Sequence, residues 1–355
     1  MTEPARNRRI VLAERPRGRA TLSSFRLEQV PIPALRDGEL LLRTLWLSLD
    51  PYMRGRMSDA PSYAAPVGIG EVMTGGTVAR VERSLNAGYP AGDLVVAHSG
   101  WQEFAVSDGS GLVKLPPDVV RPSYALGVLG MPGFTAYIGL LDIGKPQAGE
   151  TVVVAAATGA VGSVVGQIAK IKGCRVVGIA GSTEKCDWAV RELGFDACVD
   201  HSSAAFGRSL ADACTKGAAG GGAAGRGIDV YFENVGGKVF QTVVPLLNPF
   251  ARIPVCGLIS AYNEPKQPAD GEFAAALMRA VLVKRLTLRG FIFSDAYGQR
   301  RDEFLTALGG WVREGRIKYR EDVVRGLENA PDAFLGLLEG RNFGKLVVDV
   351  GGAGT

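Results

Sequence analysis

Small residues recur at a fixed spacing after a β-branched apolar run in the stretch TVVVAAATGAVGSVVGQIAK. Ala156, Gly159 and Gly162 let the chain turn tightly, let backbone N–H groups approach an anion, and let a following helix lie close to the preceding strand. The N-terminus of that helix carries the positive end of its dipole, which favours phosphate. The turn Gly159, Ala160, Val161 and Gly162 is therefore predicted to hold the pyrophosphate of a dinucleotide. A tight turn without a ligand is the alternative.

The end of the second strand, in GIAGSTEK, bears on which dinucleotide is bound. An NAD site carries an acidic residue there, about twenty residues after the glycine turn, to bind the adenosine ribose. This chain has Gly181, Ser182 and Thr183 in that place, followed by Lys185. A hydroxyl and an ammonium group hydrogen-bond and neutralise a ribose 2′-phosphate, whereas a carboxylate repels it. The predicted cofactor is NADP(H), bound by Ser182 and Lys185, with Glu184 in a helix-dipole role.

The composition argues against several other classes of protein. With 46% hydrophobic and 21% charged residues, the 355-residue chain is an ordinary globular mixture of a size for two domains. A net charge of +4, spread along the chain, argues against nucleic acid as a partner. We find neither an apolar run of membrane-helix length nor a signal-peptide pattern, and so expect a cytoplasmic protein with no membrane partner. Five cysteines without a CxxC pair and two histidines form no zinc-ligand pattern, so no metal is expected.

Two textures of sequence divide the chain. From about residue 8 to 120, short apolar or alternating runs are cut by Pro and Gly, which is typical of a β-rich domain such as a folded-over barrel. From about 122 to 260, apolar β-branched runs alternate with helical runs, which indicates a parallel sheet covered on both faces. The glycine- and alanine-rich stretch 215–227 is predicted to be a flexible surface loop.

The predicted fold is therefore of the α/β class, with two domains. A Rossmann-type doubly wound parallel sheet is expected at 126–309. The β-rich domain is expected to be discontinuous, formed by 1–125 together with 310–355, because the last helix and strand can return to it.

Seven segments spread almost from end to end carry a resemblance to a known family: LSLDPYMRGRM, GEVMTGGTVARV, GMPGFTAYIGL, AAATGAVGSVVGQIAKIKGCRVVGIAGSTEKC, DVYFENVGG, RIPVCGLISAYN and LRGFIF. With these segments the chain resembles the zinc-free, NADP-dependent branch of the medium-chain dehydrogenase/reductase superfamily. That branch contains leukotriene B4 12-hydroxydehydrogenase (prostaglandin reductase), plant 2-alkenal reductases and bacterial curcumin reductase. The resemblance implies a GroES-like fold for the β-rich domain and a homodimer.

The resemblance also assigns residues to the cofactor. Lys185 falls on the lysine that meets the 2′-phosphate, and His201 replaces a tyrosine that often serves as a second phosphate ligand. A histidine still donates to a phosphate, although Asp200 beside it makes the local field less favourable. Further cofactor contacts are expected from later segments, namely Asn234, Cys256, Gly257, Ile259, Ser260, Tyr262, Phe291, Phe293 and Asn342.

Two tyrosines are the candidates for catalysis. Without a set of metal ligands, the reaction that suits NADPH is hydride delivery to the β-carbon of an enal or enone, whose carbonyl already polarises the double bond. Negative charge then gathers on the carbonyl oxygen, where a neutral phenol stabilises it by donating a hydrogen bond. Tyr52 of DPYMRG and Tyr262 of ISAYN fit this role. A buried tyrosine that only satisfies a backbone carbonyl is the alternative for each.

The expected activity is thus NADPH-dependent reduction of the C=C bond of an apolar α,β-unsaturated aldehyde or ketone. A quinone reductase of the same superfamily is one alternative, since it shares the glycine turn but typically lacks DPYMRG and ISAYN. A non-catalytic NADPH-binding sensor is a second alternative, which the two tyrosines disfavour.

Overall fold

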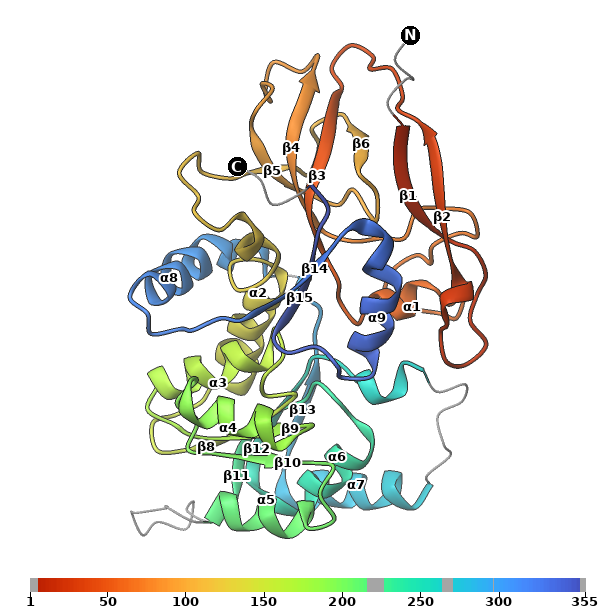
Figure 1. The fold of residues 1–355 in the computed structure, drawn as a ribbon. Helices are drawn as coiled ribbons and strands as arrows, with labels where there is room; N and C mark the ends of the chain where they lie inside the picture. The colour runs from red at the N-terminus through yellow and green to blue at the C-terminus, as the bar shows by residue number, and fades with distance from the viewer. Residues whose placement is uncertain (1–5, 216–226, 264–270, 296, 352–355) are drawn as a thin grey trace. The chain divides into compact units, whose positions relative to one another are not determined.

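The computed structural model describes residues 6–215, 227–263, 271–295 and 297–351 (Figure 1). The glycine- and alanine-rich stretch 215–227, expected to form a surface loop, lies almost wholly outside the described residues. The chain divides into two compact units. Unit 1 is Met1–Gly127, Tyr262–Pro265 and Glu321–Thr355, and unit 2 is Val128–Ala261 and Lys266–Arg320. The units change at 127/128 and 320/321, whereas the domain limits expected from the sequence are 125/126 and 309/310, which stay a prediction.

Unit 2, in its described residues, is built on six parallel strands. They are β8 (Thr151–Ala155), β9 (Arg175–Ala180), β10 (Ala197–Asp200), β11 (Ile228–Phe232), β12 (Leu247–Val255) and β13 (Thr287–Gly290). The spatial order is β10-β9-β8-β11-β12-β13, so the order reverses between β8 and β11. In a sheet of this order, dinucleotides bind at the carboxyl ends of the two strands at the reversal. The predicted Rossmann-type doubly wound sheet is confirmed.

Helices cover both faces of this sheet (Figure 1). They are α2 (Met131–Ile138), α3 (Gly162–Ile171), α4 (Thr183–Arg191), α5 (Phe206–Thr215), α6 (Gly237–Val243) and α7 (Gly271–Lys284), while α8 (Arg301–Arg313) packs on α2. Val153, Val177 and Tyr231 pack with α5, α6 and α7 in one core. Phe232, which points to the opposite face, packs against Gly139 just after α2. Burial on both faces explains the near-continuous apolar runs of the strands.

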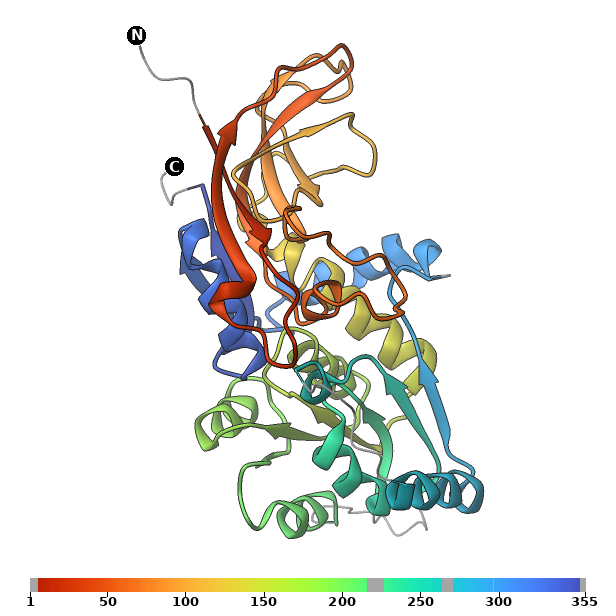
Figure 2. The same ribbon diagram turned by 90° about the vertical axis from the view of Figure 1, so that its right-hand side faces the viewer.

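Unit 1 contains two sheets in the residues that are described. Strands β1 (Arg6–Leu12) and β2 (Phe25–Pro31) form an antiparallel ribbon, red in Figure 2. A mixed sheet of seven strands contains β3 (Leu40–Ser48), β4 (Thr77–Ser84), β5 (Leu94–Ala97), β6 (Phe104–Ser107), β7 (Val113–Lys114), β14 (Glu321–Arg325) and β15 (Lys345–Asp349). Because β15 pairs antiparallel with β3, the C-terminal part of the chain returns to unit 1.

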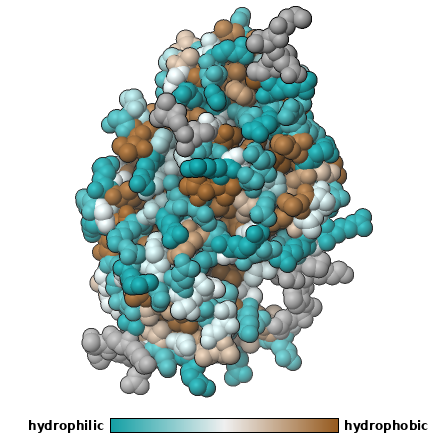
Figure 3. All heavy atoms as spheres, viewed as in Figure 1, coloured by the Kyte–Doolittle hydropathy of each residue, from teal (hydrophilic) through white to brown (hydrophobic). Residues whose placement is uncertain are grey.

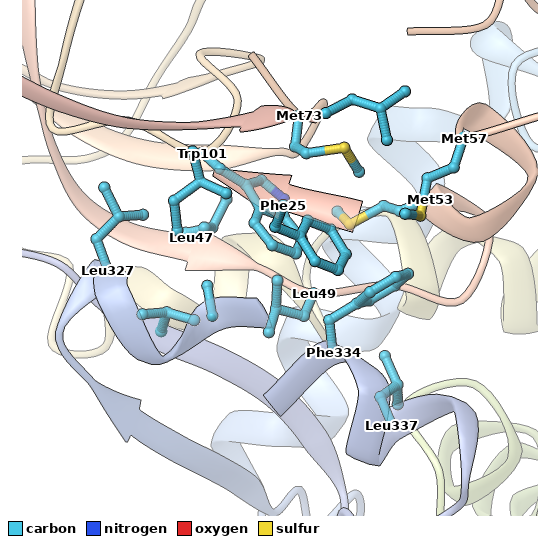
Figure 4. Close-up of a cluster of buried hydrophobic side chains, with 14 of the residues drawn as sticks. Phe25, Leu47, Leu49, Met53, Met57, Met73, Trp101, Leu327, Phe334 and Leu337 are labelled. Carbon is cyan, nitrogen blue, oxygen red and sulfur yellow. The ribbon is translucent and has the colours of Figure 1, made fainter. Parts of the chain in front are cut away.

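The core of unit 1 fixes α1 (Met53–Arg56) and α9 (Ala330–Leu338). The rings of Phe25 and Trp101 stack at 5.5 Å, and Phe334 of α9 meets both of them edge-on. Met53 of α1 is fully buried in the same cluster (Figure 4). Aromatic pairs of this geometry add about 0.5–1.5 kcal/mol each to the burial of their area. This core holds the short helix that begins directly after Tyr52.

Hydrophilic residues surround separate groups of hydrophobic ones on the face of the molecule drawn in Figure 3. In α7, Met278 and Leu282 are 66% and 77% exposed. None of the helices in the described part of the chain has the length and apolar character needed to cross a bilayer.

Candidate functional site

The glycine turn lies between β8 and α3, at the point where the strand order reverses. Ala156 adopts a φ of 51°, a left-handed conformation that glycine tolerates better, so the usual glycine at this position has a physical reason. A Cβ atom on Gly162 would lie 2.3 Å from the carbonyl oxygen of Ala156, and one on Gly159 would lie 3.2 Å from it. The close approach of α3 to the turn therefore requires Gly162 and favours Gly159.

Backbone amides at the start of α3 are available for an anion. The amide of Ser163 donates to the carbonyl of Gly159. Within the described residues, the amides of Ala160, Val161 and Gly162 have no acceptor, and no side chain caps the helix. The helix dipole adds roughly half a positive charge at this point. These amides suit the pyrophosphate that the sequence predicts.

The segment Gly181–Lys185 together with His201, called here the phosphate corner, follows the carboxyl ends of β9 and β10. Ser182 is the N-cap of α4, and its Oγ accepts a hydrogen bond from the amide of Lys185 at 3.3 Å. The hydroxyl proton of Ser182 is still free to be donated elsewhere. Lys185 is half-buried in the first turn of α4, and Glu184 beside it is exposed. A hydroxyl and an ammonium group are thus held on one helical turn.

His201 belongs to the same corner. Its amide donates to the carbonyl of Ala180 at 3.0 Å, and its Nε2 lies 3.4 Å from the place where a Cβ on Gly181 would stand. The imidazole is exposed. Asp200 beside it accepts from the amide and the hydroxyl of Ser202, and these two bonds hold the pKa of Asp200 below its usual range. The structure therefore brings His201 to the end of β9, with a carboxylate on the preceding residue.

The turn Glu233–Gly237, called here the switch-point turn, follows β11 on the other side of the strand-order reversal. Asn234 donates from Nδ2 to the carbonyl of Ala155, the last residue of β8, at 2.8 Å. The carbonyl of Val235 accepts from both the amide and the hydroxyl of Ser260, at 3.0 and 2.6 Å. Three predicted segments, from β8, β11 and the stretch after β12, are thus joined by hydrogen bonds.

Glu233 organises the switch-point turn, and the sequence analysis passes over it. Its Oε1 accepts from the amides of Val235 and Gly236 at 2.6 and 2.8 Å, while its backbone carbonyl accepts from the amides of Cys256 and Gly257. The residue is only 1% exposed, and burial raises the pKa of its carboxyl. The signal available in the sequence was an acid placed between a buried strand and a Gly-Gly pair.

Cys256 contributes its backbone rather than a reactive thiol. Burial raises the pKa of the Cys256 thiol to about 12, and the neighbouring Glu233 adds to this shift. A thiol of this kind stays protonated near neutral pH and is a poor nucleophile. The expectation that Cys256 belongs to a cofactor-lining segment, and not to a catalytic pair, stays a prediction.

Three other predicted cofactor residues lie in later segments of the chain, and two of them have structural partners. Phe291 is 7% exposed and meets Phe232 edge-on at 6.3 Å, so its ring belongs to the core of unit 2. Phe293 is partly buried. Asn342, in unit 1, donates from Nδ2 to the carbonyl of Gly344 at 2.8 Å. Their contacts with a cofactor stay predictions.

Tyr52 stands immediately before α1 in unit 1. The guanidinium of Arg56 lies 5.8 Å from its ring centre. Burial, and then the charge of Asp50, raise the pKa of the Tyr52 phenol well above its ordinary value of 10.0. The phenol therefore stays a neutral hydrogen-bond donor throughout the physiological pH range.

The stretch that carries Tyr262 meets the stretch that carries Tyr52. Arg54 of α1 donates from Nε to Oδ1 of Asn263 at 3.1 Å and from Nη2 to the carbonyl of Gly18 at 2.5 Å. Arg54 is 6% exposed, so the fold pairs this arginine with neutral oxygens. The two predicted catalytic tyrosines are thus tied together through their neighbours, Arg54 and Asn263.

A buried ion pair lies just before Tyr52, and the sequence analysis did not find it. Lys345 donates from Nζ to Asp50 at 2.7 Å and to the carbonyl of Leu49 at 2.9 Å, while the hydroxyl of Ser48 donates to the other carboxylate oxygen of Asp50. Asp50 and Lys345 are 5% and 1% exposed. Removing one partner of such a pair typically costs about 3–5 kcal/mol. The pair therefore anchors the chain at the start of DPYMRG.

The residues of unit 2 fit an NADP(H) molecule in three respects. The turn before α3 leaves no room for a Cβ atom on Gly162, and amides without an acceptor lie at the start of that helix. A hydroxyl and an ammonium group lie in the phosphate corner. In the part of the chain that the structure describes, no group of three or more His, Cys, Asp or Glu side chains is arranged to hold a metal ion.

Comparison with protein families gives two matches along the chain. Residues 8–115 match the N-terminal domain of oxidoreductase, and residues 160–309 match the zinc-binding dehydrogenase family. The NADPH-dependent curcumin reductase of Escherichia coli (strain K12) is 56% identical over 347 residues, covering 98% of each chain. Prostaglandin reductase 1 of Bos taurus is 44% identical over 334 residues, covering 93% of this chain and 95% of the relative.

A solved structure agrees with this assignment. The crystal structure of CurA from Vibrio vulnificus in complex with NADPH superposes with a TM-score of 0.92, at 57% identity, over 98% of this chain and 100% of that one. Its similarity extends through both the mixed sheet of unit 1 and the parallel sheet of unit 2, as the predicted GroES-like and Rossmann folds require. The chain therefore belongs to the medium-chain dehydrogenase/reductase family, in the zinc-free, NADP-dependent group of reductases that includes curcumin and prostaglandin reductases.

Proposed function

We propose that this chain reduces the C=C bond of apolar α,β-unsaturated aldehydes and ketones with NADPH, by adding hydride to the β-carbon. The observation that carries the proposal is the half-buried Tyr52, which stands directly before α1 and whose stretch is joined to that of Tyr262 through Arg54 and Asn263. The names of the relatives point to the same bond type: a curcumin reductase, prostaglandin reductases and, at 38% identity over 361 residues, the NADP(+)-dependent 2-alkenal reductase of Nicotiana tabacum.

In this proposal unit 2 holds the cofactor. The turn Gly159–Gly162 binds the pyrophosphate, the phosphate corner binds the 2′-phosphate, and the switch-point turn with Cys256–Ser260 lines the nicotinamide half. When bound, NADPH supplies the hydride. Ser182 and Lys185 select the phosphate because one donates a hydroxyl proton and the other a positive charge.

The proposed role of the tyrosines follows from where charge develops. As the C=C bond is reduced, negative charge gathers on the carbonyl oxygen of the substrate, and a donor aimed at that oxygen stabilises it more than it stabilises the ground state. Tyr52 and Tyr262 are the proposed donors, and the α-carbon is then protonated. Arg54 and Asn263 support them by tying the two stretches together.

A panel of three substrates tests this function against its two alternatives. NADPH oxidation is followed with a trans-2-alkenal, with a long enone such as curcumin, and with a quinone, and the products are identified. Turnover of the alkenal and the enone to saturated carbonyl compounds is expected. Turnover of the quinone alone would establish the quinone reductase alternative, and NADPH binding without consumption would establish the sensor.

The Tyr52→Phe variant tests the proposed donor. Removing one such donor lowers kcat by roughly 100-fold when it acts on developing charge, and the affinity for NADPH is expected to stay unchanged. Tyr63→Phe is the matched control, because Tyr63 is 61% exposed and stacks under the same Arg56. Equal kcat for the wild type and Tyr52→Phe would contradict the role.

We also infer that the chain acts as a cytoplasmic homodimer, on the ground of its family and composition. Strand β13 is an edge of the parallel sheet, and Thr287, Arg289 and Gly290 in it are exposed, so it offers unpaired backbone groups to a partner. Light scattering is expected to give twice the 37.4 kDa mass of one chain. A mass of 37.4 kDa at micromolar concentration would contradict the dimer.

A further inference from the structure

Glu233 is a buried acid beside the point at which the strand order of the parallel sheet reverses. It follows β11 directly, and β11 and β8 are the pair at which the order β10-β9-β8-β11-β12-β13 reverses. The carboxyl ends of such a pair flank the crevice in which doubly wound sheets bind ligands. Its carboxyl is nevertheless turned inward, at 1% exposure, so its partners are protein groups.

The hydrogen bonds of Glu233 run in two directions. Through Oε1 it accepts from the amides of Val235 and Gly236 and so closes the switch-point turn. Through its backbone it bonds to the end of β12 and to the chain after it, donating to Pro254 at 3.0 Å and accepting from Cys256 and Gly257 at 2.9 and 3.2 Å. One residue therefore fixes two segments relative to each other.

The switch-point turn is in turn hydrogen-bonded to the end of β8 and to the chain after β12. Asn234 reaches the end of β8 at Ala155, and the carbonyls of Asn234 and Val235 accept from the amides of Ile259 and Ser260. Gly236 and Gly237 have φ angles of 76° and 54°, and a Cβ on either would come within about 3.0 Å of Leu258 or Ser260. Positive φ angles at Gly236 and Gly237 are therefore needed for the turn to fit against Leu258 and Ser260.

Burial makes Glu233 an expensive choice for a purely structural cap. Its carboxyl meets the buried hydroxyl of Tyr231, but the contact lacks the geometry of a regular hydrogen bond, and neither Oε2 nor that hydroxyl has another partner among the described residues. A buried polar atom without a regular partner calls for a reason other than stability. Asp229, the buried acid of β11 itself, has a regular hydrogen-bond partner for each oxygen, since these accept from the Thr151 amide and the Asn248 side chain.

We propose that Glu233 is the positioning residue for the nicotinamide half of NADPH, acting through the switch-point turn and the Cys256–Ser260 segment, and that it has no part in binding the phosphate half. The inference rests on the proposed function for the assignment of the two halves. In this proposal Lys185 determines binding of the phosphate half of the cofactor, and Glu233 determines the position of the nicotinamide half.

Equilibrium binding of two ligands tests this proposal without turnover. NADPH contacts both ends, whereas 2′,5′-ADP lacks the nicotinamide half. Glu233→Ala is expected to weaken NADPH about tenfold or more, since it removes two charge-assisted hydrogen bonds, and to leave the affinity for 2′,5′-ADP within about twofold of the wild type. Glu233→Gln keeps an oxygen acceptor for the two amides and is expected to restore NADPH affinity to within about threefold.

Asp229→Ala is the matched control, because it removes a buried acid with two hydrogen bonds from the opposite end of the same strand. It is expected to lower the melting temperature and to leave the ratio of the two affinities unchanged. Equal weakening of both ligands by Glu233→Ala, weakening of neither, or the same selective loss in Asp229→Ala would overturn the proposal.

If Glu233→Ala does not fold, Glu233→Asp replaces it, because the carboxylate is kept but its shorter side chain draws it away from the amides of Val235 and Gly236. A selective loss of NADPH affinity of about threefold is then expected, and an unchanged ratio would overturn the proposal. Wild-type binding and turnover test the proposed function separately, so the two failures are distinguishable.

Discussion

The phosphate corner and the switch-point turn lie at the carboxyl ends of the same parallel sheet but are built on opposite principles. At the phosphate corner Glu184 and His201 are exposed and Ser182 and Lys185 half-buried, and the corner presents charge and hydroxyl groups. At the switch-point turn Glu233 is fully buried, and the hydrogen bonds run between protein groups. One end is built to attract a ligand and the other to hold a shape.

This difference teaches where specificity and positioning reside. The half-buried Lys185 discriminates by Coulomb attraction and by hydrogen bonds to a phosphate, and salt screens part of that attraction. A buried network transmits position, since its atoms have one arrangement that satisfies their hydrogen bonds. Substitutions at the two ends should therefore differ in which ligand they affect, and the glycine turn between them should affect every ligand.

Gly162→Ala has the largest expected effect, because it disturbs the glycine turn, which is proposed to bind the pyrophosphate between the phosphate corner and the switch-point turn. The added Cβ would stand 2.3 Å from the Ala156 carbonyl oxygen and 2.9 Å from its carbon, so α3 or the turn must move. We expect a loss of stability of about 1–3 kcal/mol and a loss of NADPH affinity of about 100-fold, with 2′,5′-ADP affected alike. Thermal unfolding and fluorescence titration measure the two quantities.

The control for this variant is Gly310→Ala in α8, where an added Cβ meets nothing within 4 Å. A helical alanine there should raise stability slightly and leave NADPH binding unchanged. Wild-type NADPH affinity in Gly162→Ala would show that the turn does not hold the pyrophosphate.

Lys185→Ala should break the phosphate corner alone. A charged hydrogen bond to phosphate is worth about 1.5–3 kcal/mol, so NADPH affinity should fall roughly 10- to 100-fold while NADH affinity changes less than about twofold. Titrations with both cofactors, at low and at high salt, measure this, and the gap should narrow as salt rises. Lys170→Ala is the matched loss of charge, since Lys170 pairs with Asp196 at 2.8 Å. Equal weakening of NADPH and NADH would refute the assignment of Lys185.

His201→Ala should lower NADPH affinity at the same phosphate corner, but by less than Lys185→Ala. The imidazole stands beside Gly181 but is exposed, so a hydrogen bond to the 2′-phosphate is worth about 0.5–1 kcal/mol. NADPH affinity should fall about threefold in a titration, with NADH unaffected. An unchanged NADPH affinity would show that His201 does not replace the missing tyrosine.

Glu233→Gln gives the smallest effect, visible in the pH dependence of stability. Because burial raises the pKa of Glu233 in the folded protein above its ordinary value of 4.5, the stability it contributes is present below that value and is lost as the pH rises through the folded value. Glutamine has no such loss. The melting temperature of Glu233→Gln relative to wild type should therefore be higher at pH 8 than at pH 5. The opposite ordering would mean that the carboxylate is stabilised where it lies, beside Tyr231 and Cys256.

The sequence was sufficient for the features that repeat along the chain. Alternating apolar runs and helices predicted the doubly wound sheet. Gly159, Gly162 and the absence of an acid at 181–183 predicted the NADP-type site, because each of these signals depends on neighbours close in sequence. Ala156 is instructive, since its positive φ shows that the backbone keeps the glycine conformation even where the residue differs.

The remaining features depend on partners far apart in sequence. Lys345 and Asp50 are 295 residues apart, and Arg54 and Asn263 are 209 apart, so nothing local marks either pair. Glu233 stands in a motif of the family, yet its role follows only from the amides that the fold brings to its carboxyl. Phe291 shows the converse, because an aromatic residue at a motif position proves to pack in the core.

The fate of a labelled hydride tests the central claim most directly. Wild-type protein is incubated with NADPH deuterated at the transferred position of the nicotinamide and with trans-2-hexenal, and the product is examined by NMR and mass spectrometry. The proposed reaction predicts hexanal with one deuterium on the β-carbon and a solvent-derived proton on the α-carbon. Deuterium on the carbonyl carbon of an allylic alcohol, or unconsumed aldehyde, would contradict it.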